Sequence, residues 1–164
     1  MKIKSKNTAF LGLFTALALI LSFLEALIPP IFTYAPGIKI GLPNIVIIFL
    51  LYRFGLKNAA IVSLVRIIIT AMLFGSAISL LYSFAGAVLS LIFMYLLKKA
   101  NLFSVPCISI VGAILHNLAQ ICVAVVLMGT SQLFFYLPVL LLSGLISGIL
   151  VGILSAYLIK FSKI

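Results

Sequence analysis

Acidic side chains are almost absent from this sequence. Glu25 is the one carboxylate among 164 residues, His116 is the one histidine, and tryptophan does not occur. Catalysis by paired carboxylates requires two acids, and magnesium-assisted prenyl or phosphoryl transfer requires a cluster of them. A serine activated by His116 would need a nucleophile elbow and an oxyanion loop, and neither pattern is visible. We therefore expect that the protein is not an enzyme.

Thiols and nucleotide-binding motifs are equally scarce. Cys107 and Cys122 stand 15 residues apart with no other cysteine in the chain, so we expect apolar packing residues rather than a disulfide or a metal site. One histidine and two separated cysteines do not make a haem or iron-sulfur site, and there is no phosphate-binding loop for ATP. Carriers driven by protons or sodium usually need intramembrane acids or inverted repeats, which are also missing. The sequence therefore predicts a protein without cofactor or metal that does not drive transport by itself.

Most residues of the chain are apolar. They account for 66% of the chain, charged residues for 7%, and the mean hydropathy is +1.47, which together indicate a single integral membrane domain over residues 1–164. A span needs roughly 20 apolar residues, and the pattern predicts an all-α bundle of six transmembrane helices. The predicted spans are residues 8–28, 43–54, 57–74, 77–97, 104–128 and 132–159.

Basic residues lie singly or in pairs between these segments, although the net charge is +10. This spacing is typical of topology signals and not of a nucleic-acid surface. With six spans, Lys39 stands alone on one side of the membrane and nine basic residues gather on the other. The nine are Lys2, Lys4, Lys6, Arg53, Lys57, Lys98, Lys99, Lys160 and Lys163. Because lysine and arginine concentrate on the cytoplasmic side, we expect both termini in the cytoplasm.

Polar residues inside the spans can be assigned a depth once the orientation is assumed. Arg66 lies ~14 Å along its predicted span, near the midplane, and His116 and Gln120 lie ~18 and ~24 Å along theirs. An arginine that faces lipid at this depth costs from ~3 to more than 10 kcal/mol, so we expect Arg66 to face the bundle interior. The other polar residues predicted in the outer half are Glu25, Lys39, Asn44, Ser79, Tyr82, Ser83 and Asn117.

Two explanations of these polar side chains remain open. They can be hydrogen-bond partners between helices, each worth ~1 kcal/mol, with Glu25 paired to Lys39 or Arg66. Alternatively, the excess of positive charge around one carboxylate forms a pocket for a ligand with an anionic group. Small residues indicate helix packing: Gly144, Gly148 and Gly152 predict a close contact within the bundle.

Several stretches together resemble a known bacterial membrane family. They are PGIKIGLPNIV (36–46), SLVRIIIT (63–70), SLLYSFAGAVLSL (79–91), GAILHNLAQ (112–120) and LPVLLLSGLISGILVG (137–152). They look like the Gx transporters, many of which carry the name heptaprenyl diphosphate synthase component I. This family is similar to the substrate-binding S components of energy-coupling factor (ECF) transporters. The aspartate-rich motifs of prenyl synthases are absent, so the resemblance leaves at most a non-catalytic membrane companion of such an enzyme, or a carrier of a related lipid precursor. The competing class is a membrane scaffold protein without ligand, whose polar residues only pack.

The resemblance to S components implies a substrate-capture subunit in the bacterial cell membrane. Its partners would be a small, anionic, vitamin-like or precursor molecule, a transmembrane coupling subunit and two cytoplasmic ATPases. Docking would use small residues on the first helix, where Gly12 and Ala16 stand nearest to the family pattern. The loop over residues 30–43 would close over the ligand. The residues expected to hold the ligand are Lys39, Asn44, Arg66, Ser79, Tyr82, His116, Asn117 and Gln120.

Overall fold

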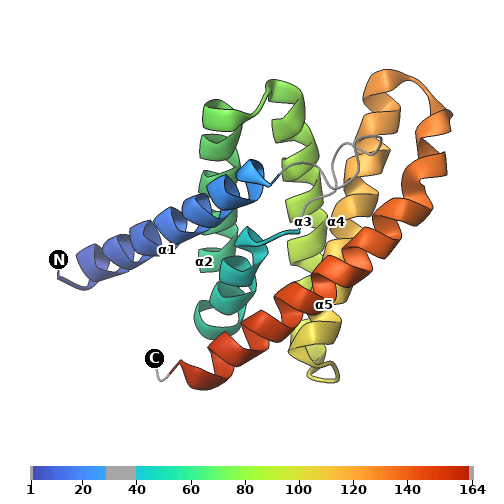
Figure 1. The fold of residues 1–164 in the computed structure, drawn as a ribbon. Coiled ribbons are helices and arrows are strands. Elements are labelled where there is room, and N and C mark those ends of the chain that lie inside the picture. The colour runs from blue at the N-terminus through green and yellow to red at the C-terminus, as the bar shows by residue number, and fades with distance from the viewer. Residues whose placement is uncertain (1, 29–39, 163–164) are drawn as a thin grey trace.

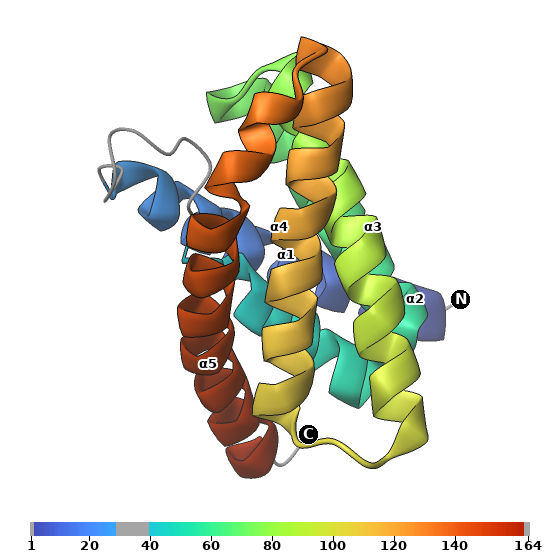
Figure 2. The same ribbon diagram turned by 90° about the vertical axis from the view of Figure 1, so that its right-hand side faces the viewer.

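The computed structural model describes residues 2–28 and 40–162, and every regular element in these two ranges is helical (Figure 1). Lys39 and most of the predicted closing loop lie outside the described residues. α3, α4 and α5 run side by side, and α1 and α2 lie behind them in Figure 2. The elements are α1 (Lys2–Leu27), α2 (Pro43–Phe74), α3 (Ala77–Ala100), α4 (Val105–Met128), a 3₁₀ helix η1 (Ser131–Tyr136) and α5 (Leu137–Phe161).

Five of the helices in the described residues are long and apolar enough to cross a membrane. The prediction of a multi-pass all-α membrane protein is confirmed at this level, and the count of six spans stays a prediction. Residues 43–54 and 57–74, expected as two spans, form α2, in which two helical segments are joined across a kink at Gly55. The first of these segments is ~18 Å long by the rise of an α-helix, short of the ~30 Å hydrocarbon layer. The location of the termini in the cytoplasm stays a prediction.

α2 folds back on itself at Gly55. This residue leaves the helical region with φ 84° and ψ 175° while the residues on both sides remain helical, a conformation that glycine adopts because it has no Cβ. Asn44 and Arg66 line the same cavity, although a straight helix would separate them by about 33 Å. The break at Gly55 therefore brings the start of α2 and the middle of its second half together (Figure 1).

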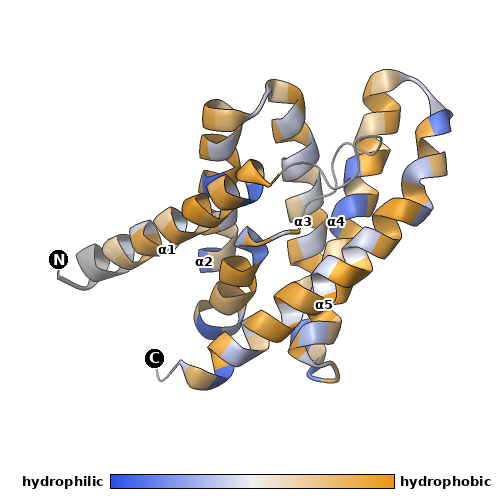
Figure 3. Ribbon diagram, in the orientation of Figure 1, coloured by the Kyte–Doolittle hydropathy of each residue, from blue (hydrophilic) through white to orange (hydrophobic). Residues whose placement is uncertain are grey.

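The first half of α2 is the centre of the hydrophobic core. Every residue from Ile45 to Leu51 is buried, and Leu50 and Leu51 have no exposed surface. A helix that is apolar on all sides belongs in the interior, and this one packs against Ala18 of α1 and Val151 of α5 in one cluster. The outer helices expose large apolar side chains, and Figure 3 shows that hydrophobic residues recur along their length.

Glycines set the contact between α4 and α5. A Cβ on Gly148 would lie 2.6 Å from the Cα of Ile110, and one on Gly152 would lie 2.6 Å from the Cα of Pro106. These distances leave no room for any side chain, so the two backbones approach closely. The predicted packing of this stripe inside the bundle is confirmed, because Gly144, Gly148 and Gly152 are all buried.

Cations close the end of the bundle that carries the C-terminus. Arg53 Nη2 donates to the carbonyls of Ile159 (2.5 Å) and Ser162 (2.6 Å) at the end of α5. Lys98 Nζ donates to the carbonyl of Leu51 (2.7 Å) at the end of the first half of α2. The last carbonyls of a helix have no partner within it and carry a partial negative charge, so both cations stabilise helix ends.

Candidate functional site

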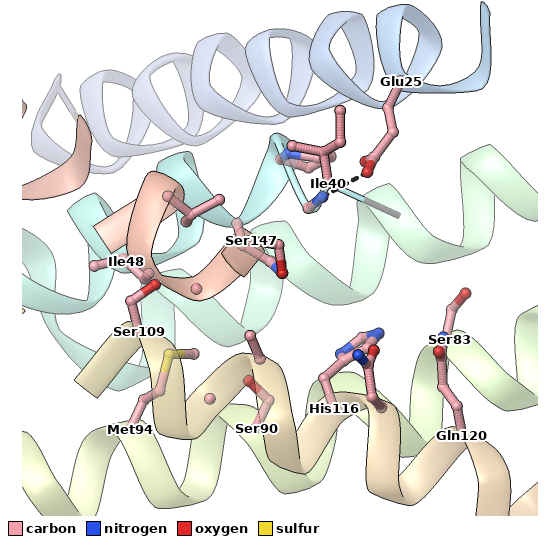
Figure 4. Close-up of a pocket in the computed structure, with 18 of the residues that line it drawn as sticks. Glu25, Ile40, Ile48, Ser83, Ser90, Met94, Ser109, His116, Gln120 and Ser147 are labelled. Atoms are coloured by element: carbon pink, nitrogen blue, oxygen red, sulfur yellow. Dashed lines mark hydrogen bonds between the residues drawn. The ribbon is translucent and has the colours of Figure 1, made fainter. Parts of the chain in front are cut away.

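A polar cavity of about 70 Å³ lies between the start of α2, the end of α1, and α3, α4 and α5 (Figure 4). Glu25 approaches it from the side opposite His116 and Gln120 in that view. The polar lining of the cavity comprises Glu25, Asn44, Arg66, Ser83, Ser90, Ser109, His116, Asn117, Gln120 and Ser147.

Most of the residues predicted to bind a ligand meet at this cavity. Asn44, Arg66, His116, Asn117 and Gln120 come from two helices and all line it, together with Glu25. From an assumed orientation and the rise of a helix, the sequence predicted that these residues lie in the same half of the bundle. The fold-back of α2 at Gly55 brings Asn44 to the cavity that Arg66 also lines. Their role in binding a ligand stays a prediction.

Two predicted residues lie elsewhere. Ser79 lines an adjoining cavity of about 190 Å³, where its side chain and that of Ser76 form the capping box that begins α3. Tyr82 lines neither cavity, and within the described residues its buried hydroxyl has no hydrogen-bond partner. The two cavities share Glu25, Arg66 and Ser83, so these three side chains form the partition between them.

Glu25 is attached to the start of α2. The backbone N–H of Gly41 donates to Glu25 Oε1 at 2.5 Å, and α2 begins with Pro43 and has no side-chain cap from Leu42. The N-terminus of a helix carries unpaired N–H groups and a partial positive charge. Glu25, the one acidic side chain of the sequence, therefore lies beside the partial positive charge at the start of α2. This helix N-terminus is one of two positive features at the cavity.

Arg66 is the other positive feature. Its Nη1 is 3.4 Å from Ser22 Oγ on α1, and the carboxylate of Glu25 attracts it electrostatically. Its Nε is buried and has no hydrogen-bond partner among the described residues. A buried donor without a partner costs about 1–3 kcal/mol, so the guanidinium retains capacity for a further acceptor.

Asn117 connects two helices. Its Nδ2 donates to the carbonyl of Leu140 at 2.7 Å and lies 3.4 Å from Ser143 Oγ, both on α5. The sequence left open whether Asn117 forms hydrogen bonds with a ligand or with another helix. In the structure its side-chain nitrogen donates to α5. This nitrogen therefore joins α4 to α5, and a role of Asn117 in binding a ligand stays a prediction.

His116 is packed against a glycine that the sequence analysis missed. A Cβ on Gly86 of α3 would lie 2.7–2.8 Å from three ring atoms of His116, so the imidazole rests on the backbone of α3. Ser83, Gly86 and Ser90 share one face of α3 because they are three and four residues apart. This run of small residues was the available signal that α3 leaves room for polar groups from α4.

The side chains around the cavity carry both positive and negative charge. Among the described residues, no group of three or more His, Cys, Asp or Glu side chains is placed to hold a metal ion. A guanidinium, a helix N-terminus, an imidazole and the amide of Gln120 instead surround the cavity, with one carboxylate among them. Groups of these kinds are able to form charge-assisted hydrogen bonds with an anionic group.

A comparison with models of protein families identifies a family for the chain. The family model described as heptaprenyl diphosphate synthase component I matches residues 14–158, which is most of the chain. The chain belongs to this family. Neither curated proteins nor solved structures give a match. Membership confirms the resemblance noted from the sequence stretches, and it links the protein by name to a prenyl diphosphate synthase.

Proposed function

We propose that the protein captures a small molecule with an anionic group from outside the cell, as the membrane-embedded binding subunit of an ECF-type transporter. The observation that carries this proposal is the meeting of Arg66 and the N-terminus of α2 at one cavity. Half-helix N-termini that point at anionic groups within the membrane are a recurrent feature of transporter binding sites. The chain supplies one carboxylate to balance these groups.

The size of the site favours a compact ligand. The main cavity has about 70 Å³ and the adjoining one about 190 Å³, whereas sites for drug-sized ligands start near ~300 Å³. A phosphate or carboxylate group fits the first cavity. The body of the ligand would enter the second after Glu25, Arg66 and Ser83 move apart.

Orientation and energy supply complete the proposal. The end that carries Arg53, Lys98 and Lys160 would face the cytoplasm, because basic residues concentrate there. Gly12 and Ala16 are exposed on α1, which suits contact with a coupling subunit. Uptake would then be driven by the coupling subunit and two ATPases.

Ligand binding by variants tests the proposal. The protein is purified in mild detergent, retained small molecules are identified by native mass spectrometry, and anionic metabolites are titrated by calorimetry. Arg66→Met keeps an apolar stem and loses the charge, so we expect affinity to fall about ten- to hundredfold. Lys57→Gln removes one exposed charge away from the cavity and should leave affinity unchanged. Equal affinities of both variants, or no binding at all, would contradict capture.

A second candidate comes from the family name. The protein would be a non-catalytic membrane component that works with heptaprenyl diphosphate synthase. Affinity purification from the native membrane separates the two candidates. Recovery of ATPase and coupling subunits supports capture, and recovery of a prenyl diphosphate synthase supports the second candidate.

A further inference from the structure

An apolar groove lies on the other side of the first half of α2. Phe14 and Leu17 of α1 form one wall, Leu158 and Phe161 of α5 form the other, and Phe49 of α2 lies at the base. Its volume is about 430 Å³, and its lining is almost entirely apolar. α1 and α5 both pack on α2, so the groove follows from the space between two helices that rest on a third.

The volume of the groove indicates which kind of molecule it can hold. An α-helix with a diameter of about 10 Å and a pitch of 5.4 Å fills about 400 Å³ per turn. The groove would therefore seat little more than one turn of a partner helix, too short a contact to fix two helices. A flexible hydrocarbon chain can instead lie along its whole length. Leu17 is 43% exposed and Phe161 is 69% exposed, so the groove is open to such a chain from the side.

Positive charge stands at one end of the groove. Ser162 lines it, and the carbonyl of Ser162 accepts a hydrogen bond from Arg53 Nη2. Lys160 is exposed and its Nζ lies 5.8 Å from the ring centroid of Phe161. Glu25, the one carboxylate of the chain, lines the polar cavity instead. An apolar groove with cations at its end complements an amphiphile with an anionic headgroup.

We propose that the groove binds an acyl chain of an anionic phospholipid, with the lipid phosphate at Arg53 and Lys160. The surrounding bilayer is the source, because the flanking side chains such as Leu13 are exposed and apolar and face the lipid of any membrane that the helices cross. This site goes beyond the proposed capture function and does not depend on it. Loss of ligand binding at Arg66 would leave it untouched.

Lipid titration of the full-length protein tests the site. Phosphatidylglycerol and phosphatidylcholine with the same acyl chains are added to the detergent-solubilised protein, and bound lipids are counted by native mass spectrometry. We expect one phosphatidylglycerol to be retained at least fivefold more tightly than phosphatidylcholine. Leu17→Trp fills the groove and should abolish this retention. Ile20→Trp, a matched change at another exposed position of α1 that lines none of the cavities described, should not.

The headgroup contact has its own test. Arg53→Gln should remove the preference for phosphatidylglycerol, and Arg53→Lys should keep it. Thermal unfolding by circular dichroism checks that each variant is folded, and Leu17→Phe replaces Leu17→Trp if the tryptophan prevents folding. Equal retention of both lipids, or retention that survives filling of the groove, overturns the proposal. A dimer seated at this face, or preferential binding of a prenyl diphosphate over phosphatidylglycerol, also overturns it.

Discussion

The contact between His116 and Gly86 shows how one missing side chain creates a polar site. The imidazole lies where any Cβ on Gly86 would be. α3 and α4 therefore approach each other with a ring between them, which fixes the ring against the cavity wall.

Gly86→Ala tests this contact. The new methyl group would lie 2.7 Å from the imidazole, so the ring must rotate or the helices must separate, and we expect a loss of ~1–3 kcal/mol in stability. Gly12→Ala is the matched control, because nothing lies within 4 Å of its added Cβ, and alanine favours a helix by up to ~1 kcal/mol. Thermal unfolding in detergent measures both. Equal stability of the two variants would show that His116 does not rest on α3.

At the scale of residues, the sequence predicted which side chains share a helix face but not which groups they form hydrogen bonds with. His116 and Gln120 are four residues apart, which was enough to place both on one side of a helix. The hydrogen bond from Asn117 to the carbonyl of Leu140 depends on how α5 packs against α4, and a backbone carbonyl leaves no mark in the sequence. The sequence also could not distinguish the apolar side chains near the cavity from those that face lipid, because that difference too depends on how the helices pack.

At the scale of elements, Gly55 separates the two halves of α2. Its φ of 84° with ψ of 175° belongs to a region that is almost confined to glycine. We expect Gly55→Ala to destabilise the protein by ~1–3 kcal/mol through backbone strain alone, because open space surrounds the position. Gly129→Asn should cost less, since Gly129 has φ 64° and ψ 21°, a left-handed conformation that asparagine tolerates. Thermal unfolding compares them, and an equal or smaller loss for Gly55→Ala would contradict a strained break.

The boundaries of α2 were predictable and its burial was not. Pro43, Gly55 and Gly75 gave the limits of both halves, because proline starts and glycine interrupts helices. An all-apolar stretch reads the same whether it faces lipid or other helices. Residues 43–54 were therefore predicted as a span, but their place at the centre of the core could not be predicted from the sequence.

At the scale of the whole molecule, charge is concentrated at one end. Arg53, Lys98 and Lys160 lie at the end with the C-terminus, and the opposite end, between α4 and α5, has no charged residue from 129 to 137. The sequence predicted this separation because, apart from Glu25 and Arg66, the charged residues lie at or beyond the ends of the apolar segments. It did not predict that Arg53 and Lys98 also hold helix ends, which needs the tertiary contacts.

Accessibility from each side tests the orientation. Lys99→Cys and Thr130→Cys are made in a chain where Cys107 and Cys122 are replaced by serine. A membrane-impermeant thiol reagent applied outside intact cells should label the Thr130 position, and the Lys99 position should react only in inside-out vesicles, because basic residues face the cytoplasm. The reverse pattern would invert the proposed binding direction.

The buried first half of α2 has a consequence for how the chain is made. At ~18 Å this segment cannot complete a crossing on its own when it leaves the ribosome and reaches the translocation machinery. We therefore expect residues 43–54 to enter the membrane together with residues 57–74, as a pair. On this account the break at Gly55 is needed during insertion as well as in the finished fold.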